Sequence, residues 1–396
     1  MANSLLNDSP ELKLILLSAY LKPDSDISIL VKHMTKEPLK WSEIQLLLKI
    51  WQIHPYFFQF IKNQELQSYV PEQYLQQFQK VYQNQAMRTI YLKRQIKDIN
   101  DHFTKNNISY CLIKGADLIQ TIYSDQPVRP MSDIDILCHP KDIHKIKHIL
   151  SKLGYFQKTM HQSDALEFLA TNRKHYPAFF HKNRHTIEVH FNLFSGAANQ
   201  NDLTSELWAH ANQIENTSQF RLNKNHHLLY LCHHLAYHIQ SPREGLVLYW
   251  FFDIYQLMKQ YQIEMNSDLY RAMSSEDRGH IDSVYKIIDY QWIKQDHLNH
   301  HLNKIHTPLV AILNQNLRST HSDRIKKATS YYWQVLSDKH PQWSFLKRFI
   351  YLFRLFFPKF SYLKDRYQVH QKWMLPFYFI FNPFMVMFRA IKRMVR

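Results

Sequence analysis

Two aspartates separated by one isoleucine open the apolar run DIDILC at residues 133–138. The run has the length and β-branched composition of a buried strand, and the turn-forming stretch SDQPVRPMS precedes it. Because side chains alternate across a strand, Asp133 and Asp135 must project from one face while the isoleucines turn to the core. Two carboxylates on one face repel each other, which is costly unless a cation lies between them. An exposed strand face on which water solvates both acids is the alternative.

Further short runs predict a small sheet around this strand. ISYCLI ends at Lys114 and Gly115, and YPAFFH and TIEVHFNLF are joined by the polar KNRH, which suits a hairpin. The amphipathic stretch KDIHKIKHILSKLGY predicts a helix between them, with Gly154 at its C-terminal cap. We therefore expect an α+β core, and alternation in TIEVHF puts Glu188 and His190 on one face.

The rest of the chain has helical periodicity, including the long pattern opened by Pro71. The predicted organisation is a helical N-terminal region at 1–105, the α+β core at 106–222, a helical domain at 223–340 and an amphipathic tail at 341–396. No apolar run of 18 residues or more is present, so a conventional membrane-spanning helix is not expected.

The positive charge is concentrated at the C-terminal end. The whole chain carries a formal +16, and the stretch 343–396 contains eleven Lys and Arg residues but one acid, Asp365. The same stretch has 17 aromatic residues. Packing over the core, contact with an anionic membrane and binding of RNA all fit such a segment.

The three cysteines are isolated in the sequence, and the N-terminus lacks the basic region of a signal peptide. These features predict a cytoplasmic protein, with a peripheral position at the inner membrane as the alternative that the tail suggests.

Paired carboxylates suit a hard divalent cation. Oxygen ligands of this kind favour Mg²⁺ or Mn²⁺, with phosphate oxygens completing the coordination shell. Glu188 fits as the third carboxylate of a site for two ions, so the pattern predicts metal-assisted phosphoryl chemistry.

The run LIKGADLIQTIYSDQPVRPMSDIDILC, followed by LGY and TIEVHFNL, resembles an uncharacterised group of bacterial nucleotidyltransferases in the DNA polymerase beta-like superfamily. The resemblance implies a small mixed sheet flanked by helices, with large helical additions at both ends of this chain. It implies two metal ions on Asp133, Asp135 and Glu188 that position an NTP. It also implies phosphate contacts near Gly115, where Lys114 stands in place of the usual serine.

Other residues keep alternative interpretations. Arg129 either reaches phosphate or lies at the surface, and His190 orients Glu188, touches the acceptor or packs in the core. His234 shares a helical face with His227 and His238, which suits zinc, nucleotide contact or packing. A buried Asp253 needs a partner, and His234 or His238 is the expected one.

The sequence thus predicts a metal-dependent nucleotidyltransferase that moves an NMP from an NTP to an acceptor. The acceptor can be a small molecule, a sugar, a protein or a tRNA. A noncatalytic module that binds RNA or anionic membrane through its tail, and a kinase-like relative that transfers phosphoryl groups, are the alternatives.

Overall fold

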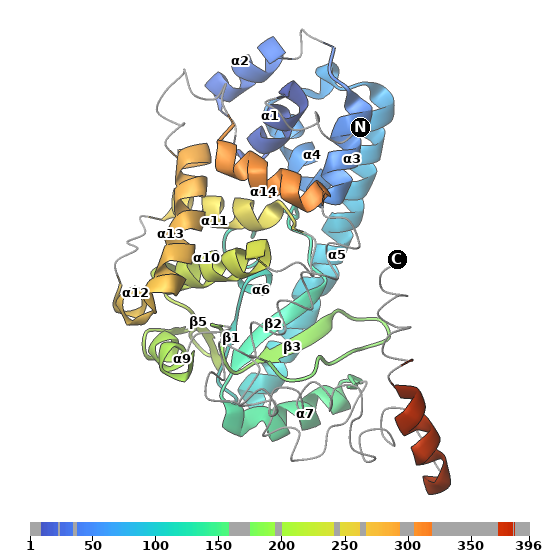
Figure 1. Ribbon diagram of the computed structural model, residues 1–396, viewed down its shortest axis with the longest axis vertical. Helices are drawn as coiled ribbons and strands as arrows, with labels where there is room; N and C mark the ends of the chain where they lie inside the picture. Colours follow the sequence, from blue (N-terminus) through green and yellow to red (C-terminus); the bar gives the residue numbers. More distant parts are fainter. Residues whose placement is uncertain are drawn as a thin grey trace.

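A computed structural model of the chain describes residues 9–22, 24–34, 38–157, 175–194, 200–240, 246–261, 267–293, 305–318, 371–382 and 384. One small sheet lies below a group of helices, and the long helix α5 (Glu72–Lys105) passes from that group along the sheet (Figure 1). Most of the tail predicted at 341–396, namely 341–370, 383 and 385–396, lies outside the described residues.

Five short strands form the sheet: β1 (Tyr110–Leu112), β2 (Asp133–Cys138), β3 (Thr186–His190), β4 (Asn212–Gln213) and β5 (Gln219–Arg221). Their order is β3-β2-β1-β5-β4. β2 pairs parallel with β3 and antiparallel with β1, while β5 pairs parallel with β1 and antiparallel with β4. The sheet is therefore mixed, and the α+β architecture expected from the sequence is confirmed.

Besides α5, the named helical elements are α1 (Pro10–Leu17), α2 (Ser25–Met34), α3 (Trp41–Ile50), α4 (His54–Asn63), η1 (Gln67–Tyr69), α6 (Gly115–Leu118), η2 (Pro140–Asp142), α7 (Ile143–Lys152), α9 (Gln200–Ala209), α10 (Lys224–Gln240), α11 (Tyr249–Gln260), α12 (Asp268–Ala272), α13 (Ser275–Ile288), the π-helical turn η3 (Asp289–Ile293), α14 (Thr307–Arg318) and η5 (Lys372–Met374). Residues 375–382, which follow η5, are helical as well. Among the described residues, none of these helices combines the length and apolar character that crossing a bilayer requires.

One face of the sheet is covered by the C-terminal half of α5 and by α7. The side chains of β2 and β3 that alternate with the acids point to this face and bury there against both helices. Members of this cluster include Ile96, Ile99, Phe103, Ile134, Ile136, Ile146, Leu150, Ile187 and Val189. The acids are thereby turned to the opposite face.

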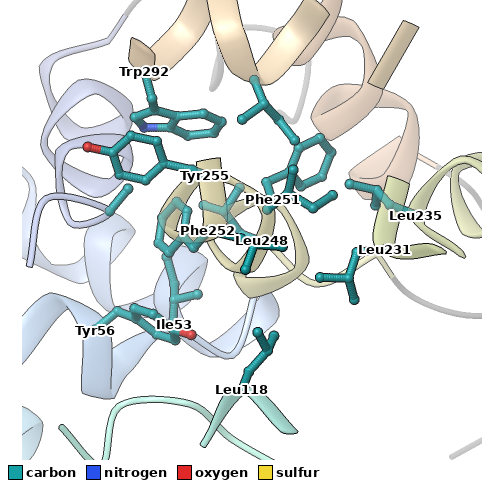
Figure 2. Packing of buried hydrophobic residues seen from close by; sticks show 14 of the residues in the cluster. Ile53, Tyr56, Leu118, Leu231, Leu235, Leu248, Phe251, Phe252, Tyr255 and Trp292 are labelled. Carbon is teal, nitrogen blue, oxygen red and sulfur yellow. The ribbon is translucent and has the colours of Figure 1, made fainter. Parts of the chain in front are cut away.

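That opposite face meets the helical group. Leu137 of β2 and Cys111 of β1 belong to a buried cluster that also includes side chains from α4, α10 and α11. Figure 2 shows this packing around α11, where Phe252 and Tyr255 lie between Trp292 of η3 and Tyr56 of α4. Helices that precede the strands in the sequence and helices that follow them therefore pack together on this face.

Several sequence predictions agree with these elements in detail. β2 has the bounds of DIDILC, and Gly154 follows α7 with φ +86°, a conformation that suits a glycine cap. The predicted hairpin is present as bridges from His175 to His190 and from Phe179 to Ile187. β4 and β5 were not predicted, because their short polar sequences carry no strand pattern. The division into four regions remains a prediction.

A buried ion pair joins the turn before β2 to α11. Nε of Arg129 donates to both oxygens of Asp253 at 3.2 and 3.0 Å, and Nη2 lies 2.9 Å from Oδ2. The hydroxyl of Tyr123 donates to the same carboxylate at 3.0 Å, and that of Tyr56 lies 3.4 Å away. Both charged side chains are almost fully buried, so each depends on the other for neutralisation.

Asp253→Asn is therefore expected to lower the free energy of unfolding by about 3–5 kcal/mol, because it leaves the Arg129 guanidinium buried without its counter-ion. Urea denaturation followed by circular dichroism measures the loss. The matched control is Asp101→Asn, which removes the exposed partner of Lys97 on α5 and should leave the midpoint nearly unchanged. Equal midpoints for the two variants would contradict the assigned role of Asp253.

Candidate active site

The acids are positioned by the two parallel strands β2 and β3. In their register, Asp135 lies opposite Glu188 and Leu137 lies opposite His190. Residues opposite one another in neighbouring strands point to the same side of the sheet, so Asp133, Asp135, Glu188 and His190 share one face. The alternation expected from the sequence is confirmed.

Asp135 is the centre of this group. Its Oδ1 accepts a hydrogen bond from Nζ of Lys114 at 2.7 Å, and Nε2 of His190 lies 2.8 Å from the same oxygen. Burial alone would raise the pKa of Asp135, but the Lys114 ammonium and the His190 hydrogen bond hold it well below its usual range. The carboxylate therefore stays charged in a nearly dry place.

Lys114 reaches Asp135 from an unusual backbone conformation. It follows β1 with φ +52° and ψ −132°, in the region that favours glycine. Burial opposes its charge, whereas Asp135 and the neighbouring phenol of Tyr230 on α10 raise its pKa. A protonated lysine thus supplies the cation that the paired acids require.

Asp133 is held less firmly than Asp135. Burial and the negative charge of Asp135 raise its pKa from 3.8 to about 6, with Glu188 adding to the repulsion. Ser132 donates a hydrogen bond to Asp133 Oδ1 at 3.1 Å. The Lys114 ammonium forms its hydrogen bond with Asp135 and not with Asp133. The negative charge of Asp133 is therefore less well compensated.

His190 connects the two strands through the carboxylates. It is fully buried, and its Nε2 lies 3.7 Å from Oε2 of Glu188 as well as close to Asp135. This contact is the main cause that lowers the pKa of Glu188. Within the described residues, Nδ1 of His190 has no hydrogen-bond partner. Its contact with Glu188 fits the orienting role and its full burial fits packing in the core, while contact with the acceptor stays a prediction.

These residues fit a divalent cation. Ligand atoms of Asp135, Glu188 and His190 all lie within 4.8 Å of one another, and Asp133 stands two residues along the same strand. Among the described residues, these three carboxylates share the ammonium of Lys114. A bound cation would relieve the repulsion by Asp135 and Glu188 that, together with burial, raises the pKa of Asp133. Carboxylate oxygens are also the ligands that Mg²⁺ and Mn²⁺ prefer.

Gly115 and Arg129 differ from the expectation of an open phosphate site. A β-carbon on Gly115 would collide with Nη1 of Arg129, so the guanidinium fills the space beside the glycine. Arg129 is buried, its Nη1 donates to the Pro130 carbonyl at 2.9 Å, and its remaining donors face Asp253. Gly115 is needed here for the close approach of Arg129, and Arg129 is not a surface residue.

Asp253 and His234 also differ from expectation. The carboxylate pairs with Arg129 and two tyrosines, not with His234 or His238. His234 packs its ring 4.4 Å from that of His238 and 5.5 Å from that of Trp250. The proposed pairing was wrong because the turn before β2 brings a stronger partner to Asp253 than its helical neighbours offer.

Asp117 is a second buried acid, and the sequence patterns did not predict its role. Asp117 of α6 accepts from Nε of Arg221 at 3.0 Å and lies 3.4 Å from Nδ1 of His227. This contact fixes α6, and with it the turn at Lys114, against β5 and α10. A lone acid within the apolar stretch ADLI was the available signal, because a buried carboxylate needs partners.

Comparison with known proteins adds a family. A family model described as an uncharacterised nucleotidyltransferase matches residues 37–278. The matched stretch covers well over half of the chain and contains all five strands together with Asp133, Asp135 and Glu188. No curated protein and no solved structure matches the chain.

The different surroundings of the two aspartates predict opposite effects of one substitution on the metal-free protein. Asp133→Asn should raise the free energy of unfolding at pH 7.5 by about 1–3 kcal/mol, because it removes a charge that the folded state disfavours. Asp135→Asn should lower it by about 3–5 kcal/mol, because it leaves Lys114 buried without its partner.

The pH dependence gives the sign of the Asp133 effect. Its folded pKa of about 6 lies above the ordinary 3.8, so the folded state binds the proton more tightly. The loss of folding stability caused by the charge on Asp133 is therefore absent below about pH 4. It grows as the pH rises towards 6 and is complete above that. Denaturation of wild type and Asp133→Asn from pH 4 to 8 measures it, and a constant difference between the two proteins would contradict the assignment.

Proposed function

Because the chain belongs to the uncharacterised nucleotidyltransferase family, we propose that it transfers an NMP from an NTP to an acceptor in a reaction that depends on divalent cations. The acceptor nucleophile forms a bond to the α-phosphorus, the bond to the β-phosphate oxygen breaks, and pyrophosphate leaves. The observation that carries this proposal is the shared face of β2 and β3, where Asp133, Asp135 and Glu188 converge.

We assign the metal ligands to these three acids, with two Mg²⁺ or Mn²⁺ ions as the expected occupants. When bound, the ions would neutralise the phosphates and activate the attacking oxygen. His190 fixes the orientation of Asp135 and Glu188 through its contacts with both carboxylates. It is a positioning residue in this proposal.

Lys114 is the proposed phosphate contact. Its ammonium neutralises Asp135 and lies at the end of β1, beside the acids. A cation on Asp135 would replace that charge and leave Lys114 to pair with a phosphate oxygen of the NTP. Gly115 and Arg129 have an indirect role in this arrangement. Their close packing and the ion pair of Arg129 with Asp253 hold the turn that carries Lys114.

The contact between Lys114 and Asp135 also favours a second candidate function. A built-in ammonium compensates the acid without a metal, as expected for a noncatalytic module that keeps the fold. Phosphoryl transfer by a kinase-like relative is a third outcome. The three candidates differ in the group that the acceptor receives: the NMP, the γ-phosphoryl group or nothing.

Transfer of label separates them. Protein is incubated with Mg²⁺, candidate acceptors and NTPs labelled at the α or the γ phosphate. Label from the α position should appear in the acceptor, with pyrophosphate released. Transfer of γ label would instead support the kinase-like function, and no transfer to any small-molecule, sugar, protein or tRNA acceptor would favour the noncatalytic module.

Asp133→Asn is the informative variant, because its fold is expected to be stable while a metal ligand is lost. Its transfer rate should fall by roughly two orders of magnitude or more. Asp101→Asn, the same change at an exposed position on α5, is the control and should retain the wild-type rate. Equal rates for the two variants would contradict the assignment of Asp133.

For the tail, we propose contact with an anionic membrane surface. Residues 375–382 are helical, and Trp373, Phe377, Ile380, Phe381 and Phe384 are all largely exposed. The last four follow the i, i+3, i+4, i+7 spacing of one helical face. An apolar face of this kind within a basic segment is typical of helices that lie in a membrane interface.

Vesicle sedimentation tests this contact. The full chain should sediment with vesicles that contain anionic lipid and much less with zwitterionic ones, and Phe377→Ser with Phe381→Ser should reduce binding at least about tenfold, since burial of each aromatic ring is lost. Binding to RNA that is unaffected by the double substitution, without vesicle binding, would overturn the membrane proposal.

A further inference from the structure

A second group of metal-ligating side chains lies at the opposite edge of the sheet from the acids. Glu206 is on α9, His210 directly follows that helix, and His226 is in the first turn of α10. One potential ligand atom from each residue lies within 4.8 Å of the other two. β3 is one edge of the sheet, and the hairpin of β4 and β5 that separates α9 from α10 forms the other.

The fold holds this group in place from both sides. Trp208 of α9 packs its ring 5.9 Å from that of Phe220 on β5, which fixes the helix against the sheet. His226 enters α10 five residues after the end of β5. The spacing of four between Glu206 and His210 brings Nδ1 of the histidine within 3.1 Å of Oε1 of the glutamate.

His226 provides an observation that is independent of the spacing of the three residues. Its side chain is 4 % exposed, and within the described residues its Nδ1 has no hydrogen-bond partner. Its ring lies edge to face with that of His210, with centroids 5.3 Å apart.

The donor set indicates which cation would bind. Two imidazole nitrogens and one carboxylate oxygen are the protein ligands of many zinc sites, whereas Mg²⁺ and Ca²⁺ take oxygen ligands. Glu206 and His210 are partly exposed, so their side chains have room to close around an ion held by the buried His226. Water would occupy the fourth, solvent-facing position.

We propose that Glu206, His210 and His226 bind one Zn²⁺ ion, which ties α9 to α10 across the β4–β5 hairpin. The site is separate from Asp133, Asp135 and Glu188, and it does not depend on the transfer reaction. Its expected consequence is a stabilised sheet edge next to the Arg221 and Asp117 contact.

Metal binding to the full chain tests the site. Metal-free protein is loaded with Zn²⁺ in excess Mg²⁺, which competes at the carboxylates of the first site, and bound zinc is counted after gel filtration. Wild type should retain one equivalent. Loading with Co²⁺ in place of Zn²⁺ should give the visible absorption bands of a tetrahedral site with nitrogen and oxygen ligands.

His210→Ala and Glu206→Gln are the main variants, because both side chains are partly exposed and their loss leaves the buried core intact. Each should weaken zinc binding about tenfold to a hundredfold or more, and His226→Ala should abolish it. Asp133→Asn is the control for the first site and should retain the ion. Wild type without zinc, or equal retention by wild type and His210→Ala, would overturn the proposal.

Discussion

The buried ion pair between Arg129 and Asp253 is the contact on which the position of the acids depends. Arg129 belongs to the turn that leads into β2, and Asp253 belongs to α11 in the helical group. Tyrosines from two further segments point to the same carboxylate. Burial of either charge without the other would be costly, so the ion pair fixes the position of the turn against α11. The strand that carries Asp133 and Asp135 starts directly after this turn. Gly115 follows from this contact, since a side chain there would collide with the guanidinium.

The next constraint is electrostatic. Asp133, Asp135 and Glu188 converge on one face of a small sheet, and the described contacts supply them with one ammonium and one imidazole. The balance is uneven, because Asp135 is fully compensated while the pKa of Asp133 stays raised. A site of this kind attracts further cations although the whole chain carries +16. Local arrangement, not net charge, therefore decides what binds here, and it agrees with membership of a nucleotidyltransferase family.

The accuracy of the sequence predictions follows the strength of local patterns. The strand at β2 and the helices α5 and α7 were predicted because their apolar residues recur at the periods of the structures they form. β4 and β5 were not predicted because Asn212–Gln213 and Gln219–Arg221 are short and polar. β5 is a strand through its pairing with β1, and β4 through its pairing with β5. The proposed partners of Asp253 were wrong for a related reason. The prediction considered His234 and His238, which lie near Asp253 in the sequence. The observed partner, Arg129, is 124 residues away in the sequence.

The sequence by itself determined that the carboxylates share a face, because alternation along a strand is a property of the backbone and needs no tertiary contact. It also predicted that positive charge would lie close to these acids. Only the tertiary structure decided which groups contact these carboxylates. The positive φ of Lys114, the register of β2 with β3 and the buried pair at Asp253 bring distant residues within a few ångströms. These contacts depend on how helices and strands pack, and no local pattern of residues encodes that packing.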